Sequence, residues 1–124
     1  MPDIKQGEIY MVEIPKSHTV GTEQWKRRPY IIMSRLAVNR AGDNVIGIPL
    51  SSATHKACQH RILLPAVEII KTVGSTFNFV NSVALTDQAR VLDYQRLELP
   101  CIGTLSRNAV LSVQLGLAFL FDIR

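Results

Sequence analysis

The stretch Gly7-Glu-Ile-Tyr-Met-Val-Glu-Ile14 is rich in β-branched and aromatic residues and predicts a β-strand, which Pro15 ends. Along the rest of the chain, similar short apolar runs recur between clusters of turn-forming residues. Gly47 and Pro49 lie inside one of them and indicate a bulge, a sheet edge or a close backbone approach. The runs predict further strands at 29–34, 45–50, 60–64, 82–85 and 89–92.

Helical patterns are short until the end of the chain. Single helical turns are expected at 36–39 and 93–97, whereas Val67–Lys71 fits either a strand or a helical turn. Ser106 is a natural N-cap for a final helix, whose apolar face we expect to be core. That face comprises Val110, Val113, Leu117 and Leu120, widened by Leu111, Ala118 and Phe121.

Short strands followed by one final helix predict a fold that is mainly β with some α. The expected architecture is a small β-barrel or strongly bent sheet with helices at its rim. The chain has 124 residues and contains no repeat, linker or low-complexity segment. We therefore expect a single domain spanning residues 1–124.

The charge of the chain is uneven. Hydrophobic residues make up 47% of it and charged residues 19%, as in globular proteins. The net charge is +4, and residues 1–62 carry nine Lys and Arg against five Asp and Glu. Much of this excess lies between Lys16 and Arg40, which favours a polyanion partner, nucleic acid before membrane. A solvated basic surface without a partner is the alternative, and charge by itself leaves both open.

The cysteines and the apolar tracts indicate a cytoplasmic protein. Cys58 and Cys101 lie far apart in sequence, so we expect reduced thiols rather than a disulfide framework. The chain shows no secretory signal pattern. Its longest apolar tract, Ala109–Phe121, falls short of the ~20 residues that span a bilayer. We expect no membrane association.

The segment Gly21-Thr-Glu-Gln-Trp-Lys-Arg-Arg-Pro29 has the composition of a functional loop. It lies between two predicted strands, where loops commonly carry function. Arg28 can bind a phosphate through two parallel hydrogen bonds, and Trp25 offers a face to an unstacked base. Pro29 fixes the backbone directly after Arg28. Composition alone also fits a solvated charged loop.

Other polar residues indicate little chemistry. The spacing His55-x-x-Cys58 is half of a zinc site, and a structural site needs four ligands, so we expect no metal. His18 is expected to be solvated. Lys56, Arg61 and Lys71 are expected to be surface charges. The chain contains no phosphate-binding glycine motif.

Four blocks occur in an order typical of one protein family. They are Gly7-Glu8-Ile9-Tyr10; Gly21-Thr22-Glu23-Gln24 followed by Arg28-Pro29; Pro49-Leu50-Ser51; and Ser82-Val-Ala-Leu85 followed by Asp87-Gln88, Arg90, Asp93 and Arg96-Leu97. Gly103-Thr-Leu105 also fits. In these blocks the chain resembles the MazF/PemK family of bacterial toxins, also called mRNA interferases. One departure is Lys26, where the family usually has Gly.

The resemblance implies an SH3-like barrel of the CcdB/MazF type with a C-terminal helix. It further implies a homodimeric toxin that cleaves single-stranded RNA at short sequences without metal or cofactor and is inhibited by an antitoxin protein. By position, the implied catalytic residues are Arg28, Ser51, Glu23 and Asp87. The implied RNA-binding residues are Thr22, Gln24, Trp25, Lys26, Arg27, Gln88 and Arg90.

The side chains suggest how these roles divide. Arg28 suits charge stabilisation but is a poor general base, because it stays protonated. A carboxylate, Glu23 or Asp87, is the better proton acceptor. Ser51 can hydrogen-bond a phosphate oxygen or position the 2′-hydroxyl, and a 2′,3′-cyclic phosphate product is expected. Arg90 either lines the RNA groove or pairs with Asp87 or Asp93.

A second function class remains open. Ser51, Lys26 and Thr22 replace residues that are usual in the family, which fits a non-catalytic barrel of the same fold. Such a protein would bind nucleic acid, antitoxin or DNA gyrase. Binding without a cleaved RNA product would identify it.

Overall fold

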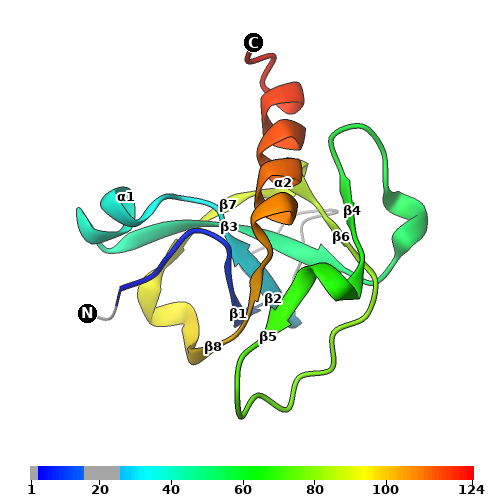
Figure 1. Ribbon diagram of the computed structural model, residues 1–124. Coiled ribbons are helices and arrows are strands. Elements are labelled where there is room, and N and C mark those ends of the chain that lie inside the picture. The colour runs from blue at the N-terminus through cyan, green and yellow to red at the C-terminus, as the bar shows by residue number, and fades with distance from the viewer. Residues whose placement is uncertain (1–2, 16–25) are drawn as a thin grey trace.

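The computed structural model describes residues 3–15 and 26–124, in which eight strands form an antiparallel sheet with a long helix packed against it (Figure 1). The strands are β1 (Glu8–Ile14), β2 (Lys26–Ile32), β3 (Asn44–Ser51), β4 (Ile62–Leu64), β5 (Ile69–Lys71), β6 (Ser82–Ala84), β7 (Arg90–Asp93) and β8 (Leu97–Leu105). The α-helices are α1 (Leu36–Arg40) and α2 (Arg107–Leu120). The 3₁₀ turns are η2 (Thr54–Lys56), η3 (Ala66–Glu68), η4 (Thr86–Gln88) and η5 (Tyr94–Arg96).

The sheet is bent into a nearly closed barrel. Its order is β4-β6-β3-β2-β1-β8-β5, and β7 pairs with the beginning of β3. The edge strands β4 and β5 are joined by residues 65–68 alone, a short link that keeps the two edges near each other. The predicted mainly β fold, a nearly closed barrel with a C-terminal helix, is confirmed.

The two faces of the sheet build two apolar clusters. Ile9 pairs with Ile31, and both lie in a cluster that also contains residues of α2. Tyr10 pairs with Tyr30, and both lie in a second cluster on the other face. Successive residues of a strand point to opposite faces, so this division follows from the alternation along β1 and β2.

Helix α2 begins where the sequence predicts, but it buries a narrower face. The Ser106 hydroxyl accepts a hydrogen bond from the Ala109 N–H at 3.1 Å, which confirms the N-cap. Val113 is fully buried, whereas Leu111 and Phe121 are more than half exposed, so their expected place in the core is wrong. No helix formed by residues 3–15 and 26–124 combines the length and apolar character needed to cross a membrane.

Three local predictions need correction or completion. The sequence did not predict β8, because Pro100 and Gly103 interrupt its apolar alternation and its pairing with β1 shifts register between Ile9 and Met11. The ambiguous Val67–Lys71 segment contains part of a 3₁₀ turn and then a strand. Of the alternatives for Gly47, the close approach holds: a Cβ there would lie 2.7 Å from a methyl group of Leu92.

Candidate functional site

Arg28 lies on β2 beside the end of β3. The β2–β3 pairing ends at Tyr30–Pro49, and Ser51 pairs with Val83 of β6. The Arg28 side chain nevertheless reaches the carbonyl of Leu50, the residue before Ser51. The two residues that the sequence places at the catalytic site therefore lie near each other, at the neighbouring ends of β2 and β3.

The guanidinium of Arg28 is weakly held. Its Nη1 donates to the Leu50 carbonyl over 3.5 Å, at the long limit for a hydrogen bond. Its Nε is buried and has no hydrogen-bond partner among the described residues. Burying such a donor without a partner costs roughly 1–3 kcal/mol, which an anionic ligand that accepted its hydrogen bond would recover.

Ser51 is less accessible to solvent than Arg28. The residue is 6% exposed, and its Oγ accepts the Ala53 N–H at 3.1 Å. The hydroxyl proton still allows Ser51 to donate a hydrogen bond. Ser52, which the sequence analysis did not select, lines a hollow of about 280 Å³ together with Arg28. The Ser51-Ser52 doublet was the signal for this second hydroxyl.

Asp87, in η4, is engaged by a partner that the sequence analysis had assigned to the surface. Arg61 donates from Nε to Oδ1 at 2.8 Å and from Nη2 to Oδ2 at 2.6 Å. The side chains are only 26% and 29% exposed. These hydrogen bonds hold the pKa of Asp87 below its usual range, so the carboxylate is a weaker base than a free one.

Gln88 and Arg90 carry unsatisfied buried polar atoms. The Oε1 of Gln88 and the Nε of Arg90 have no hydrogen-bond partner within the described part of the chain. Arg90 pairs with Gly47 in the β3–β7 register. In residues 3–15 and 26–124, neither Asp87 nor Asp93 forms an ion pair with it. Of the two expected roles for Arg90, the pairing with these carboxylates is not observed.

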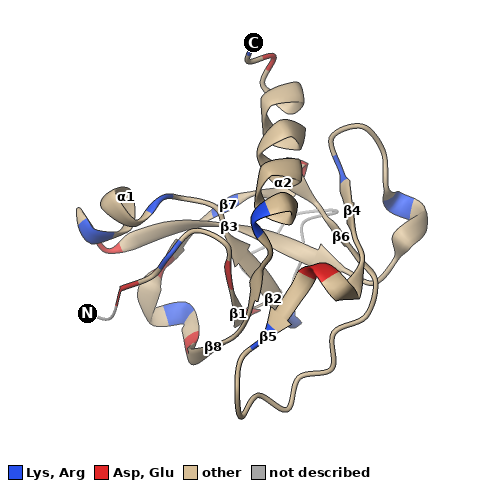
Figure 2. Ribbon diagram, viewed as in Figure 1, with Lys and Arg blue, Asp and Glu red and all other residues tan. Residues whose placement is uncertain are grey.

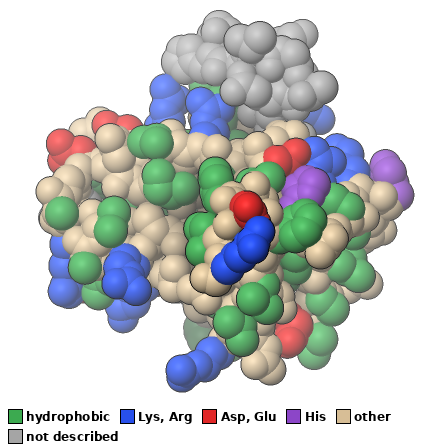
Figure 3. Space-filling model, turned by 90° about the horizontal axis from the view of Figure 1, so that it is seen from above, with side chains coloured by type: hydrophobic (Ala, Val, Ile, Leu, Met, Phe, Trp, Pro, Cys, Tyr) green, Lys and Arg blue, Asp and Glu red, His purple; other side chains and the backbone are tan. Residues whose placement is uncertain are grey.

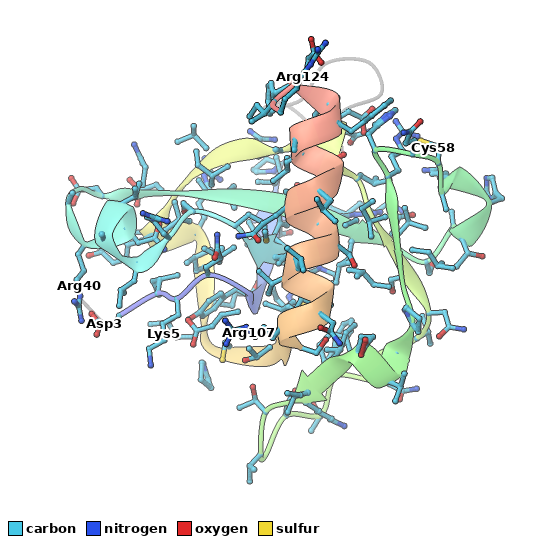
Figure 4. The ribbon with its side chains drawn as sticks, turned by 45° about the horizontal axis from the view of Figure 1, so that its top comes forward. Asp3, Lys5, Arg40, Cys58, Arg107 and Arg124 are labelled. Carbon is cyan, nitrogen blue, oxygen red and sulfur yellow. The ribbon has the colours of Figure 1, made fainter. Side chains whose placement is uncertain are left out.

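The basic zone seen in the sequence is divided by the fold. Arg27 donates to both carboxylate oxygens of Glu98 at 2.7–3.0 Å, and Arg40 pairs with Asp3 at 2.6 Å. Figure 4 shows Arg40 and Asp3 turned toward each other at one end of the molecule. Lys and Arg are accordingly spread over separate parts of the ribbon (Figure 2). Position in sequence therefore overstates the local positive charge.

Lys26 has an unusual backbone conformation. Its φ is +82°, in the left-handed region that favours glycine. The family that the chain resembles usually has Gly at this position, so the departure in sequence is also a point of backbone strain. The remaining selected residues, Thr22, Glu23, Gln24, Trp25 and His18, lie outside the described residues.

Cys58 and His60 are the cysteine and histidine that the fold brings together as possible metal ligands. Cys58 Sγ lies 3.6 Å from His60 Nδ1. The described ranges contain no group of three or more His, Cys, Asp or Glu side chains that could hold a metal ion.

Comparisons with known proteins identify relatives. A family model described as a PemK-like, MazF-like toxin of type II toxin-antitoxin system matches residues 5–121. No curated protein sequence matches the chain. MazF from Deinococcus radiodurans has a TM-score of 0.75 at 22% identity, over 98% of this chain and 99% of that chain. An endoribonuclease in complex with its cognate antitoxin, from Mycobacterial species, has a TM-score of 0.72 at 15% identity, over 98% and 97%. A MazE-MazF structure from Deinococcus radiodurans gives 0.71 at 18%, over 100% of both chains.

Proposed function

The chain belongs to the family of PemK-like, MazF-like toxins of type II toxin–antitoxin systems. We propose that it is a toxin that cleaves single-stranded RNA, with Arg28 and Ser51 as residues of its active site. The observation that carries this proposal is the buried Nε of Arg28, which has no hydrogen-bond partner among the described residues, in a side chain that reaches the carbonyl next to Ser51. A cation with an unused donor suits a phosphate that gains negative charge during the reaction.

The chemistry follows from what RNA supplies. The 2′-hydroxyl loses its proton to a base and its oxygen bonds to phosphorus, while the bond from phosphorus to the 5′-oxygen breaks. The 5′-oxygen takes up a proton, and the other product carries a 2′,3′-cyclic phosphate. Arg28 stabilises the charge on the phosphate oxygens, and the hydroxyls of Ser51 and Ser52 donate hydrogen bonds to them. We expect no metal requirement, because a carboxylate can take the proton of the 2′-hydroxyl and water can supply the proton that the 5′-oxygen takes up.

The ion pair of Asp87 bears on which carboxylate acts as the general base. Arg61 holds Asp87 ionised with a lowered pKa, which makes it a poor proton acceptor at neutral pH. This supports Glu23 as the base and the Arg61–Asp87 ion pair as a positioning element for η4. Asp87 then keeps Gln88 in place rather than touching the reacting atoms.

Arg90 suits a contact to a second phosphate. Its Nε is buried and unpartnered within the described residues, like that of Arg28. Arg28 reaches the carbonyl of Leu50 and Arg90 pairs with Gly47, three residues apart along β3, which is roughly 10 Å of strand. Two such cations would fix the direction of an RNA strand along β3. Lys26, Arg27, Thr22, Gln24, Trp25 and Gln88 complete the proposed RNA-binding set.

A second copy of the chain is the partner proposed for α2. Leu111, Leu115 and Phe119 follow one another at four-residue spacing and are 54%, 62% and 50% exposed. Hydrophobic side chains gather around the free end of this helix (Figure 3). Such a stripe is typical of an interface. An antitoxin protein is the other proposed partner, since two of the similar structures are named as antitoxin or MazE complexes.

The test uses purified protein and a long unstructured RNA in EDTA. The wild type should produce fragments ending in a 2′,3′-cyclic phosphate. Arg28→Ala should reduce cleavage at least about 100-fold. Arg40→Ala is the control, because it also removes one arginine that a carboxylate, Asp3, already pairs, and it lies outside the proposed RNA-binding set.

Two outcomes would contradict this assignment. Intact RNA with salt-dependent binding would favour the non-catalytic alternative. Equal loss of cleavage in Arg40→Ala and Arg28→Ala would show that general charge matters rather than the position of Arg28.

A further inference from the structure

The segment between β5 and β6 is anchored on the sheet by one aromatic side chain. It forms the long green loop below β5 in Figure 1. Phe79 packs so closely on β8 that a Cβ at Gly103 would lie 2.9 Å from its ring. Phe77 contacts Phe79 with ring centroids 4.8 Å apart, tilted by 60°. The glycine therefore makes room for Phe79, and Phe79 in turn supports Phe77.

Phe77 lines a hollow of about 550 Å³, within the range of roughly 300–1,000 Å³ that small-ligand pockets occupy. Thr72, Ser75, Thr76 and Asn78 add hydroxyl and amide groups to its walls. Its charged residues, Arg27 and Glu98, form an ion pair with each other. The hollow is thus aromatic, able to form hydrogen bonds and electrically balanced.

This hollow continues into the smaller one beside Arg28. Both are lined by Met11, Arg27, Phe77 and Asn78. The smaller hollow begins where the pairing of β2 with β3 ends, and Arg28 and Ser52 line it there. One groove therefore leads from a cation with an unused donor to a neutral aromatic pocket.

We propose that the Phe77 hollow binds an unstacked nucleobase of the RNA strand whose phosphate is held at Arg28. The ring of Phe77 stacks on the base, and Asn78 hydrogen-bonds its edge. The Thr72 hydroxyl contacts Cys101 Sγ and the Ser75 hydroxyl accepts the Phe77 N–H, so Thr76 and Asn78 are the wall residues that remain to bind a ligand. A base fits better than an apolar protein side chain, which would leave these two polar groups without partners. A base also fits better than a second phosphate, because the ion pair leaves no net charge. The inference rests on the proposed function, since it takes RNA as the ligand.

Binding of 2′-O-methyl oligonucleotides tests the pocket without cleavage, because these strands lack the nucleophile. Fluorescence anisotropy would compare homopolymers of the four bases with an abasic strand of equal length. Phe77→Leu, which keeps apolar volume but loses the flat face, should weaken binding of at least one homopolymer about tenfold. Phe77→Tyr should stay within about twofold of the wild type. Val38→Ala, a half-exposed position on α1, is the unrelated control.

Further readouts separate base binding from a structural role. The abasic strand should bind the wild type and Phe77→Leu alike, and the salt dependence of binding should be unchanged, since phosphate contacts are unaffected. Asn78→Ala should alter the preference among the homopolymers. Thermal melting would establish that each variant is folded.

The inference and the proposed function can fail separately. If the wild type binds these strands through Phe77 but never cleaves unmodified RNA, the function fails and the pocket stands. Two results refute the pocket when the wild type cleaves RNA. In one, Phe77→Leu binds every strand as tightly as the wild type does; in the other, Phe77→Leu loses as much affinity for the abasic strand as for the homopolymers. A wild type that binds none of the strands overturns both.

Discussion

The Arg61–Asp87 ion pair provides a quantitative test of how η4 is held. A double-mutant cycle compares the free energy of unfolding of the wild type with that of Arg61→Ala, Asp87→Ala and the double variant. Exposed ion pairs contribute about 0–1 kcal/mol, and hydrogen bonds to charged groups about 1.5–3 kcal/mol. Both side chains are roughly three-quarters buried and joined by two hydrogen bonds, so we expect a coupling free energy of about 1–2 kcal/mol at pH 7.

Urea unfolding measures this coupling free energy, and the lowered pKa of Asp87 determines how the coupling changes with pH. The folded pKa of Asp87 is lowered, so its contribution is fully present above the unfolded value of about 3.9. It is lost as the pH falls through the lowered folded pKa. The coupling should therefore be constant from neutral pH to about pH 5 and then decline in acid.

Cleavage by the same variants distinguishes a positioning role from proton transfer. If Asp87 positions η4, then Arg61→Ala, Asp87→Ala and the double variant should lose activity to a similar extent, within about threefold. If Asp87 is the general base, Asp87→Ala alone should fall a further 10²–10⁴-fold, in the range typical of lost acid–base catalysis. A rate for Asp87→Ala about 100-fold below that of Arg61→Ala would refute the positioning role.

Three further outcomes are expected. Lys26→Gly should raise the free energy of unfolding by up to about 1 kcal/mol in urea titrations, because it removes the left-handed strain, whereas Lys26→Ala should give no gain. Gly116→Ala should lower the melting temperature, at a cost of about 1–3 kcal/mol, since the added Cβ would lie 2.8 Å from a side-chain carbon of β4; Gly42→Ala, with open space around it, should not. Leu115→Glu should convert a dimer to a monomer in sedimentation analysis, while Gln114→Glu on the same helix should leave the dimer intact; equal behaviour of the two variants would argue against the α2 interface.

Local patterns predicted most elements of the barrel. The strand at Glu8–Ile14 is an apolar run rich in strand-forming residues, and the start of α2 is a short-range cap formed by Ser106. Both signals reside within a few neighbouring residues, so one sequence suffices to read them. β8 was missed because its pairing with β1 is irregular and accommodates Pro100. No local sequence pattern predicts such a pairing.

The candidate site was predictable in its residue types and only partly in its geometry. The order of the blocks selected Arg28 and Ser51, and the fold brings Arg28 to the carbonyl of Leu50, the residue before Ser51. The same reasoning selected Asp87 without Arg61, because the two residues meet through the fold, 26 positions apart. It also did not select Phe77. Phe77 packs on Phe79, and Phe79 fits against β8 because Gly103, distant in sequence, has no side chain.

The sequence by itself determined most of the strands, the helix cap and the identity of the cation before Pro29, since each depends on adjacent residues. The order of four blocks along the chain determined the family. Only the tertiary structure decided which charges remain available for a ligand. Arg27 meets Glu98 across 71 positions and Arg40 meets Asp3 across 37, while Arg28 keeps a buried donor without a partner among the described residues. Ion pairing depends on strand register and on distance through space, and neither quantity exists until the chain has folded.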